Sequence, residues 1–370
     1  MSHISWTLKL SLLCLLLINQ SQVLAGTIIT GTTIGVKWYP GHYYHVMSGD
    51  PSVDSFNMKA AYTEMNTASS SIAGIQLRLS WKQLEPTKDG YDFHIIDGHL
   101  AKLISTKKRL FLFIAHKGDA LDGGVVPDYI KSIGGSYTYK SSLNSKVITE
   151  NAKFWEDAVR DRFIKLLNQL GNKYNAHSHF VGVALPETSM GEDSVTDAQE
   201  SKYFTNLLFI NQTMRLAFPN TLTTQFTNFP RSILPNFIGS LRDMGVALGG
   251  PDIFIDDPGL NAIGTKYTND GVYLHYPRLS GKVALTPSVM SGDYERTIAN
   301  PSDPKNRKPT IDELLDFGRD KLKANIIFWT RAPKFYSAVL KKLRDLTIAN
   351  NSRVKLNATC PTALITCITD

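Results

Sequence analysis

The sequence predicts a single (β/α)₈ TIM barrel, and three observations carry this prediction. Eight short apolar runs alternate with helical patterns along the chain. Such alternation indicates parallel strands joined by right-handed crossovers, and eight units close most economically as a barrel. The chain has 370 residues, 42% of them hydrophobic, which is enough for one large core. A carboxylate, Glu187, follows the apolar run Phe180–Leu185, and enzymes with this fold have their catalytic residues at the carboxyl ends of the strands.

The first half of the chain supplies four strands and three helices. Thr32–Tyr39 is the first expected strand and Ala73–Trp81 the second, and Arg109–His116 is the third, with nearly all of its residues apolar. Phe180–Leu185 is apolar throughout, as expected of a strand buried on both faces. Helical periodicity marks the connecting segments. They are Phe56–Met65, Ile95–Leu103 and the strongly amphipathic Phe154–Tyr174.

The second half continues the pattern. The expected strands are Leu222–Phe226, Gly245–Leu248, Lys282–Pro287 and Asn325–Thr330. The expected helices are Asp197–Ala217, Ser232–Met244, Ile311–Lys323 and Lys334–Ala349. A doubly wound open sheet is the alternative, but the first strand is followed by no G-x-G-x-x-G turn and the chain has no P-loop. The segment 118–151 is too long for a plain connection, so it is expected to be a lid or an insertion beside the site.

The ends of the chain indicate export. Residues 1–25 resemble a secretory signal peptide, with Lys9 before the apolar run Leu10–Ile18 and small residues before Gly26. That run is too short to span a bilayer, so no membrane segment is expected after cleavage. The catalytic domain would occupy residues 26–349, followed by a tail at 350–370. Cys360 and Cys367 in this tail are expected to form a disulfide in an oxidising compartment, with two free thiols as the alternative. The predicted location is secreted or periplasmic.

The charge pattern excludes some partners. The formal net charge is +7, with no dense basic stripe, so nucleic acid is not an expected partner. No metal-ligand spacing is present and no cofactor is implied. The expected partner is a carbohydrate, and the protein is expected to be a monomer.

Residues at the strand ends form a mixture typical of sugar sites. Aromatic faces stack on sugar rings, whereas amides, arginines and carboxylates bind hydroxyl groups. The expected substrate-binding residues are Trp38, Arg78, Trp81, His116, Asn228, Tyr294 and Trp329. His116 could equally be a satisfied strand-end histidine, and Arg78 could serve only to pair a carboxylate.

Glycosidic cleavage needs two carboxyl groups, one protonated and one ionised. Glu187 is the expected general acid/base, and this role requires a raised pKa. Asp293 is the first choice for the second carboxylate, ahead of Asp252 and Glu295. Turns offer a structural alternative for Asp252 and Asp293.

One stretch resembles a known family. The residues Arg78-Leu79-Ser80-Trp81-Lys82-Gln83-Leu84-Glu85-Pro86, then Gly90-Tyr91-Asp92-Phe93, resemble the second-strand region of (β/α)₈ glycoside hydrolases of the cellulase and beta-galactosidase clan. Trp329, after an apolar run, resembles the substrate-facing tryptophan of that clan. The resemblance implies a barrel and a glycosidase that acts on an oligo- or polysaccharide.

Two departures from that clan define the alternatives. The clan has Asn-Glu at the end of the fourth strand, where this chain has Pro186-Glu187. The clan's nucleophile is a glutamate at the end of the seventh strand, and here Asp293 or Glu295 would have to serve from a shifted position. A barrel that binds carbohydrate without hydrolysing it is therefore the alternative function. An esterase is a third and weaker one, since no nucleophile elbow is present.

Overall fold

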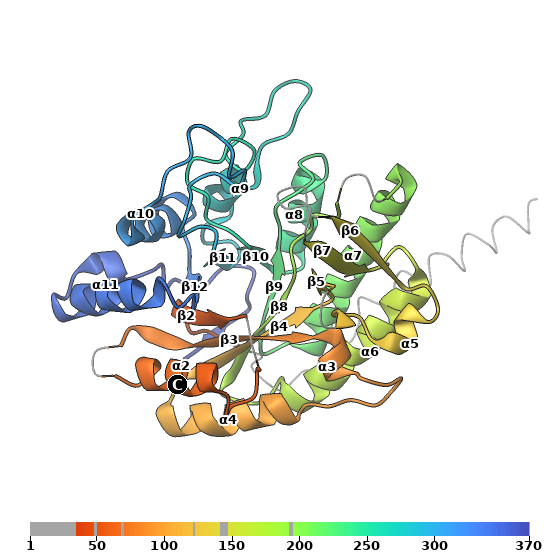
Figure 1. Ribbon diagram of the computed structural model, residues 1–370, viewed down its shortest axis with the longest axis horizontal. Coiled ribbons are helices and arrows are strands. Elements are labelled where there is room, and N and C mark those ends of the chain that lie inside the picture. The colour runs from red at the N-terminus through yellow and green to blue at the C-terminus, as the bar shows by residue number, and fades with distance from the viewer. Residues whose placement is uncertain are drawn as a thin grey trace, which may run out of the picture. The chain divides into compact units, whose positions relative to one another are not determined.

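The computed structural model describes residues 35–47, 50–67, 70–120, 123–140, 147–191 and 195–369 (Figure 1). The expected signal peptide, residues 1–25, lies outside these ranges.

Eight parallel strands close into a barrel, which confirms the predicted fold. In barrel order they are β2 (Gly41–Val46), β3 (Ile72–Ser80), β4 (Arg109–Ala115), β8 (Phe180–Leu185), β9 (Leu222–Phe226), β10 (Ala247–Gly250), β11 (Leu285–Val289) and β12 (Ile326–Thr330). β12 pairs with β2 from Ile326 opposite Gly41 to Thr330 opposite His45, so the sheet has no free edge. β4 and β8 are buried at every residue, which explains their continuous apolar runs.

Helices surround the strands (Figure 1). They are α2 (Phe56–Met65), α3 (Trp81–Leu84), α4 (His94–Thr106), α6 (Asp157–Tyr174), α7 (Asp197–Ala217), α8 (Leu234–Asp243), α9 (Val272–Leu279), α10 (Ile311–Asp316) and α11 (Tyr336–Ile348). A π-helix, Phe317–Lys321, continues α10, and a short 3₁₀ turn covers Ser352–Val354. α7 and α10 each begin with a capping box, Thr196 with Gln199 and Thr310 with Glu313. α9 was not predicted, because Pro277 lies inside it and interrupts the helical pattern.

The predicted first strand was wrong in position. Thr32–Tyr39 was expected, but the barrel strand begins after Pro40, at Gly41. The two tyrosines of β2 pack on opposite faces of the sheet. Tyr43 contacts Phe111 inside the barrel, while the Tyr44 hydroxyl donates a hydrogen bond to Glu64 on α2. The shift matters because it moves the residues before Pro40, Trp38 included, to the other end of the barrel.

Aromatic rings fill the barrel interior. Phe111 makes edge-to-face contacts with Tyr43 and with Phe328, at centroid distances of 5.0 and 5.1 Å. Gly182 on β8 faces this layer, and a Cβ there would lie 1.8 Å from the Phe111 ring. Glycine at this position is therefore a packing requirement, because the ring occupies the space of a side chain.

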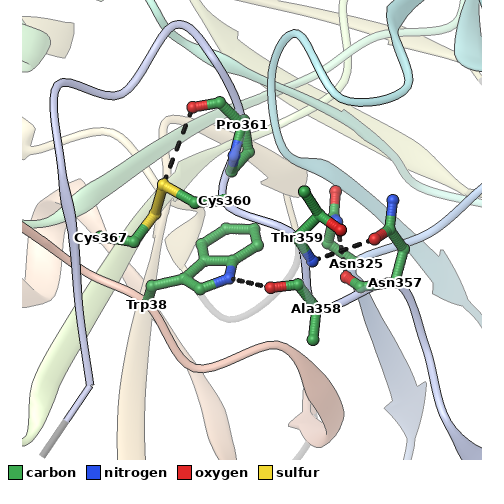
Figure 2. The surroundings of a disulfide bond; sticks show 8 residues. All are labelled: Trp38, Asn325, Asn357, Ala358, Thr359, Cys360, Pro361 and Cys367. Atoms are coloured by element: carbon green, nitrogen blue, oxygen red, sulfur yellow. Dashed lines mark hydrogen bonds between the residues drawn. A yellow bond between two sulfur atoms is a disulfide. The ribbon is translucent and has the colours of Figure 1, made fainter.

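The N-terminal end of the barrel is closed by segments from both ends of the described chain, and we call it the barrel floor. β1 (Val36–Lys37) pairs with β13 (Cys367–Ile368). Cys360 and Cys367 form the expected disulfide, which lies beside the Trp38 indole (Figure 2). Trp38 is 3% exposed and donates from Nε1 to the Ala358 carbonyl, 320 residues away in sequence, at 2.8 Å. Leu364 joins the same interior cluster, so the tail belongs to the core.

The segment 118–151 forms a small structure of its own after β4. β5 (Lys117–Asp119), β7 (Ile148–Ala152) and β6 (Ser136–Lys140) make an antiparallel sheet, and α5 (Asp128–Lys131) lies between β5 and β6 in the chain. The Tyr137 hydroxyl of β6 donates to the Met190 carbonyl beyond β8. This insertion thus lies beside the end of β8, where Glu187 stands.

Candidate active site

Four neighbouring strands are each followed by a polar residue at the same distance in sequence from the strand's end. Lys117, Glu187, Asn228 and Asp252 stand two residues past the ends of β4, β8, β9 and β10. These strands are adjacent in the barrel, so the four residues share one arc of its C-terminal end, which we call the barrel mouth. Arg78, near the end of β3, extends this arc, because β3 pairs with β4.

Glu187 is held on both carboxylate oxygens. Lys117 Nζ donates to Oε1 at 2.7 Å, and Asn228 Nδ2 donates to Oε2. Lys117 is 5% exposed and also donates to the Ser189 carbonyl. Burial lowers the pKa of Lys117, but the charge and hydrogen bond of Glu187, together with Tyr139 and Tyr203, outweigh burial, and the net shift of the pKa is upward. The buried ammonium thus has the carboxylate of Glu187 as its charge partner.

Asn228 is itself fixed by its neighbours. Its Oδ1 accepts hydrogen bonds from the backbone N–H groups of Phe229 and Ser189, at 2.8 and 3.2 Å. These bonds settle which end of the amide faces Glu187, because only Nδ2 remains to donate. The carboxylate is therefore positioned by a preorganised amide.

Asp252 has a different environment. Burial, and then the negative charge of Glu187, raise the pKa of Asp252 to about 7, while Arg296 opposes the shift. A carboxyl group with this pKa holds a proton over much of the range below neutrality. The mouth thus carries one carboxylate with an ammonium partner and, two strands away, one carboxyl group that retains its proton.

Asp293, the first choice from sequence, follows β11 and has Asp252 as a charged neighbour. It is fully buried, and its Oδ2 accepts backbone hydrogen bonds from Ile253 and Met290, at 2.7 and 2.8 Å. Burial and the nearby Asp252 raise its pKa well above the usual value. Asp293 therefore connects the loops after β10 and β11.

Arg78 points into the barrel beside Glu187. Its guanidinium lies over the Phe113 ring at 5.7 Å and donates to the Lys117 carbonyl at 3.3 Å. Burial lowers the pKa of Arg78, against the opposing charges of Glu187 and Asp119. His45 lies next to it on β2 and bonds to Gln76. Burial, and then Arg78, lower the His45 pKa to about 3, so this imidazole is neutral.

The three tryptophans expected to stack on sugars all lie elsewhere, so these predictions were wrong. Trp38 lies in the barrel floor. Trp81 is fully buried outside the barrel, with its ring 5.0 Å from Phe163 of α6. Trp329 is 1% exposed and donates from Nε1 to His42 at 3.1 Å. Successive strand residues alternate between the two faces, and Phe328 is the neighbour that faces the interior.

Three further expectations are corrected. His116 is fully buried between Phe154 and Phe163, and burial lowers its pKa to about 3, so it is a core histidine. Tyr294 stacks on Phe335, and its hydroxyl donates to the Thr330 carbonyl at 3.0 Å. Glu295 is exposed and pairs with Lys334 at 2.8 Å.

The motif that resembles the glycoside hydrolase clan, residues 78–93, contains side chains that hold the β3–α4 connection together. Trp81 Nε1 donates to Glu85 at 2.9 Å, and Arg162 of α6 bonds both Glu85 and Asp89. Glu85 is fully buried, so these partners satisfy its charge. Apart from Arg78, the motif therefore specifies the β3–α4 connection.

Sequence reasoning gave Lys117 no role, although a lysine directly after a buried strand is a usable signal. Its contact with Glu187 joins residues 70 positions apart, which no local pattern reveals. In the described ranges, no group of three or more acidic, histidine or cysteine side chains could hold a metal ion. The described helices also include none long and apolar enough to cross a membrane.

Comparison with known proteins supports the fold. No family model matches the chain, and no curated protein matches it in sequence. Among solved structures, it is similar to the catalytic domain of a beta-amylase from Paenibacillus polymyxa, with a TM-score of 0.50 and 9% identity over 88% of this chain and 97% of that one.

Two beta-galactosidases are similar as well. The enzyme from Marinomonas ef1 has a TM-score of 0.52 and 10% identity over 85% of this chain. The enzyme from Halorubrum lacusprofundi has a TM-score of 0.50 and 9% identity over 79% of this chain. The alignments span 61% and 52% of those two proteins. The chain thus has the (β/α)₈ fold of glycoside hydrolases.

Proposed function

We propose that this protein is a secreted glycoside hydrolase that cleaves O-glycosidic bonds of an oligo- or polysaccharide, with Glu187 and Asp252 as its carboxyl pair. The observation that supports it is the contrast between the two groups. Glu187 has an ammonium and an amide on its oxygens, whereas Asp252 has a pKa raised to about 7. Glycosidases need one ionised and one protonated carboxyl group flanking the bond.

The roles follow from these environments. Asp252 donates its proton to the leaving glycosidic oxygen. Glu187 either attacks the anomeric carbon or activates a water molecule on the opposite face of the sugar. This assignment exchanges the role expected of Glu187 from sequence, because Asp252 is the carboxyl group with the raised pKa that a general acid needs. Lys117 and Asn228 are positioning residues for Glu187.

The test is hydrolysis of a panel of aryl glycosides and polysaccharides by the mature protein. Glu187→Gln and Asp252→Asn should each lose at least about 10³-fold in turnover, since each removes one carboxyl role. Asp293→Asn is the matched control, because an amide can still accept the two backbone bonds. Following the anomer released by NMR separates retention from inversion. Turnover that survives both Glu187→Gln and Asp252→Asn would disprove the assignment.

A sugar-binding barrel without hydrolysis is the second candidate. The observation that favours it is the Lys117–Glu187 ion pair, which already satisfies one of the two carboxylates. Turnover by the wild type decides between the candidates, and Lys117→Met then tests the positioning role of Lys117. In a hydrolase, Glu187 loses its positioning partner and turnover falls about 10²-fold. In a binding protein no glycoside is turned over by the wild type, and saturable binding to one glycan remains.

Secretion is part of the proposal. The resemblance of residues 1–25 to a signal peptide supports it, and so does the disulfide, since such bonds persist in oxidising compartments. N-terminal sequencing of the exported protein should begin at Gly26. Size-exclusion chromatography with light scattering tests the expected monomer.

A further inference from the structure

Arg296 is an unusual cation at the barrel mouth. It stands on the loop after β11, and its guanidinium lies over the Phe254 ring at 5.7 Å. Within the described residues its guanidinium makes no hydrogen bond or ion pair, and its Nε is buried without a partner. A guanidinium carries five N–H donors in a fixed fork, so leaving all of them unbonded is costly unless a ligand or water binds there.

The position of Arg296 connects two features. On one side its charge acts on Asp252 and Asp293, which places it beside the carboxyl pair. On the other side it lines a hollow of about 370 Å³ together with Arg307 and Lys308. The hollow is large enough for a sugar substituent, and three of its lining side chains are cationic, against one glutamate, Glu295.

The other two cations of this hollow are already engaged. Arg307 pairs with Asp256 at 3.2 Å and with Glu313 at 2.8 Å. Lys308 lies over the Phe335 ring at 4.9 Å. Lys308 carries a single ammonium, whereas Arg296 is the arginine of the hollow for which the described residues provide no ion pair, and its fork geometry matches the paired oxygens of a carboxylate or a sulfate.

Arg78 repeats the arrangement at the other end of the arc. Its one hydrogen bond to a described residue goes to the Lys117 carbonyl, and the charged neighbours Glu187 and Asp119 affect it without accepting a hydrogen bond from it. Each member of the carboxyl pair thus has an arginine beside it with most of its donors unused. Such donors form stronger, charge-assisted hydrogen bonds with a carboxylate or sulfate on the sugar than with a neutral hydroxyl group.

We propose that the hollow at Arg296 binds an anionic substituent, a carboxylate or a sulfate ester, on a sugar unit next to the bond that is cleaved. The substrate class is then an acidic glycan. This inference rests on the proposed function for the position of the scissile bond, but the anion site itself can be tested without turnover.

The experiment is calorimetric titration of the full mature protein with glucuronate, glucose 6-sulfate and glucose, at about physiological ionic strength. At least one anionic sugar should bind about tenfold or more tightly than glucose, as a charge-assisted pair requires. Binding of glucuronate alone would identify a uronic acid, and binding of the sulfate alone a sulfated sugar. Binding of both would support the shared anion chemistry.

Variants identify the ligand. Arg296→Gln should weaken anion binding about tenfold or more, and Arg296→Lys should recover part of it, since the charge returns without the fork. Arg307→Gln is the matched control in the same hollow, and it should change affinity less than about threefold, because Arg307 is already paired. The melting temperature of Arg296→Gln should be unchanged.

Several results would overturn the proposal. These are glucose binding as tightly as both anions, no binding of either anion, equal losses for Arg307→Gln and Arg296→Gln, and unchanged binding in Arg296→Gln. Failure of the proposed function looks different, because the anionic sugar then binds through Arg296 while no glycan is hydrolysed.

Discussion

The two ends of the barrel differ in polarity: the floor is mostly apolar, whereas the mouth carries charged side chains. The floor is an apolar cluster that includes Trp38, Leu364 and the Cys360–Cys367 disulfide, and its polar contacts include the β1–β13 backbone pairing and the Trp38 indole bond. The mouth carries carboxyl groups, a lysine and arginines whose charges are only partly satisfied. This difference separates stability from chemistry. Variants of the floor should unfold the protein without changing the site, and variants of the mouth should change turnover without unfolding it.

The largest effect should come from breaking the carboxyl pair. Combining Glu187→Gln and Asp252→Asn should cost little more turnover than either change alone, because the two groups act as a unit. Single-turnover kinetics on the best substrate of the panel measures this, with the melting temperature as the control. If the losses of the two single variants multiplied, the two residues would act independently.

Breaking the floor should give the largest loss of stability. Trp38→Ala should lower the free energy of unfolding by about 3–5 kcal/mol, since it removes a buried ring and leaves a cavity. Denaturant unfolding measures the loss. Turnover per folded molecule should remain within about twofold of wild type at 20 °C. A selective loss of turnover at unchanged stability would place Trp38 in the site after all.

The pH profile sharpens the comparison at the mouth. Turnover should fall about tenfold per pH unit above 7, because the proton that Asp252 donates is lost there. Stability should change in the same direction. A carboxyl group whose folded pKa lies above its unfolded value of 3.8 stabilises the fold at low pH, and this contribution is lost as pH rises toward 7. In Asp252→Asn the stability loss over this range should be smaller. If the residual turnover of Asp252→Asn showed the same decline above pH 7 as the wild type, another group would be the acid and the assignment would be wrong.

Opening the disulfide should have a smaller effect. Cys360→Ser combined with Cys367→Ser should cost about 2.5 kcal/mol in the chain-entropy estimate for a loop of this length. Thermal unfolding with and without reductant checks it, since reductant should no longer affect the double variant. An equal response of both proteins to reductant would show that the bond does not form.

The smallest effect should come from Asp293→Asn. An amide oxygen can accept the bonds from Ile253 and Met290, and the raised pKa means that little charge is lost. Both turnover and melting temperature should stay near wild type. A loss of turnover as large as that of Asp252→Asn would restore Asp293 as the second carboxylate.

The sequence predicted the barrel well because buried parallel strands leave continuous apolar runs. Phe180–Leu185 and Leu222–Phe226 were predicted with their exact bounds. The site was predicted less well. Glu187, Arg78, Asn228 and Asp252 lie at the mouth, but Trp81 and Trp329 face the helices. Which face a residue occupies depends on the register of each strand, and one residue of uncertainty reverses it.

Electrostatic roles were beyond the sequence for another reason. The environment of Glu187 is made by Lys117 and Asn228, which come from two other strands. That of Asp252 comes from burial and from Glu187. Only a closed barrel brings these groups together, so spacing along the chain could not reveal which carboxyl group keeps the proton.

The floor also bears on how the protein is made. Its two halves, around Trp38 and Ala358, are separated by 320 residues, and synthesis proceeds from the N-terminus. A nascent chain can therefore pair β2 to β12 while its inner aromatic layer still faces water at one end. Until residues 358–368 have left the ribosome, that end of the barrel exposes apolar side chains. The interior of the barrel is therefore covered at this end only after residues 358–368 have been synthesised.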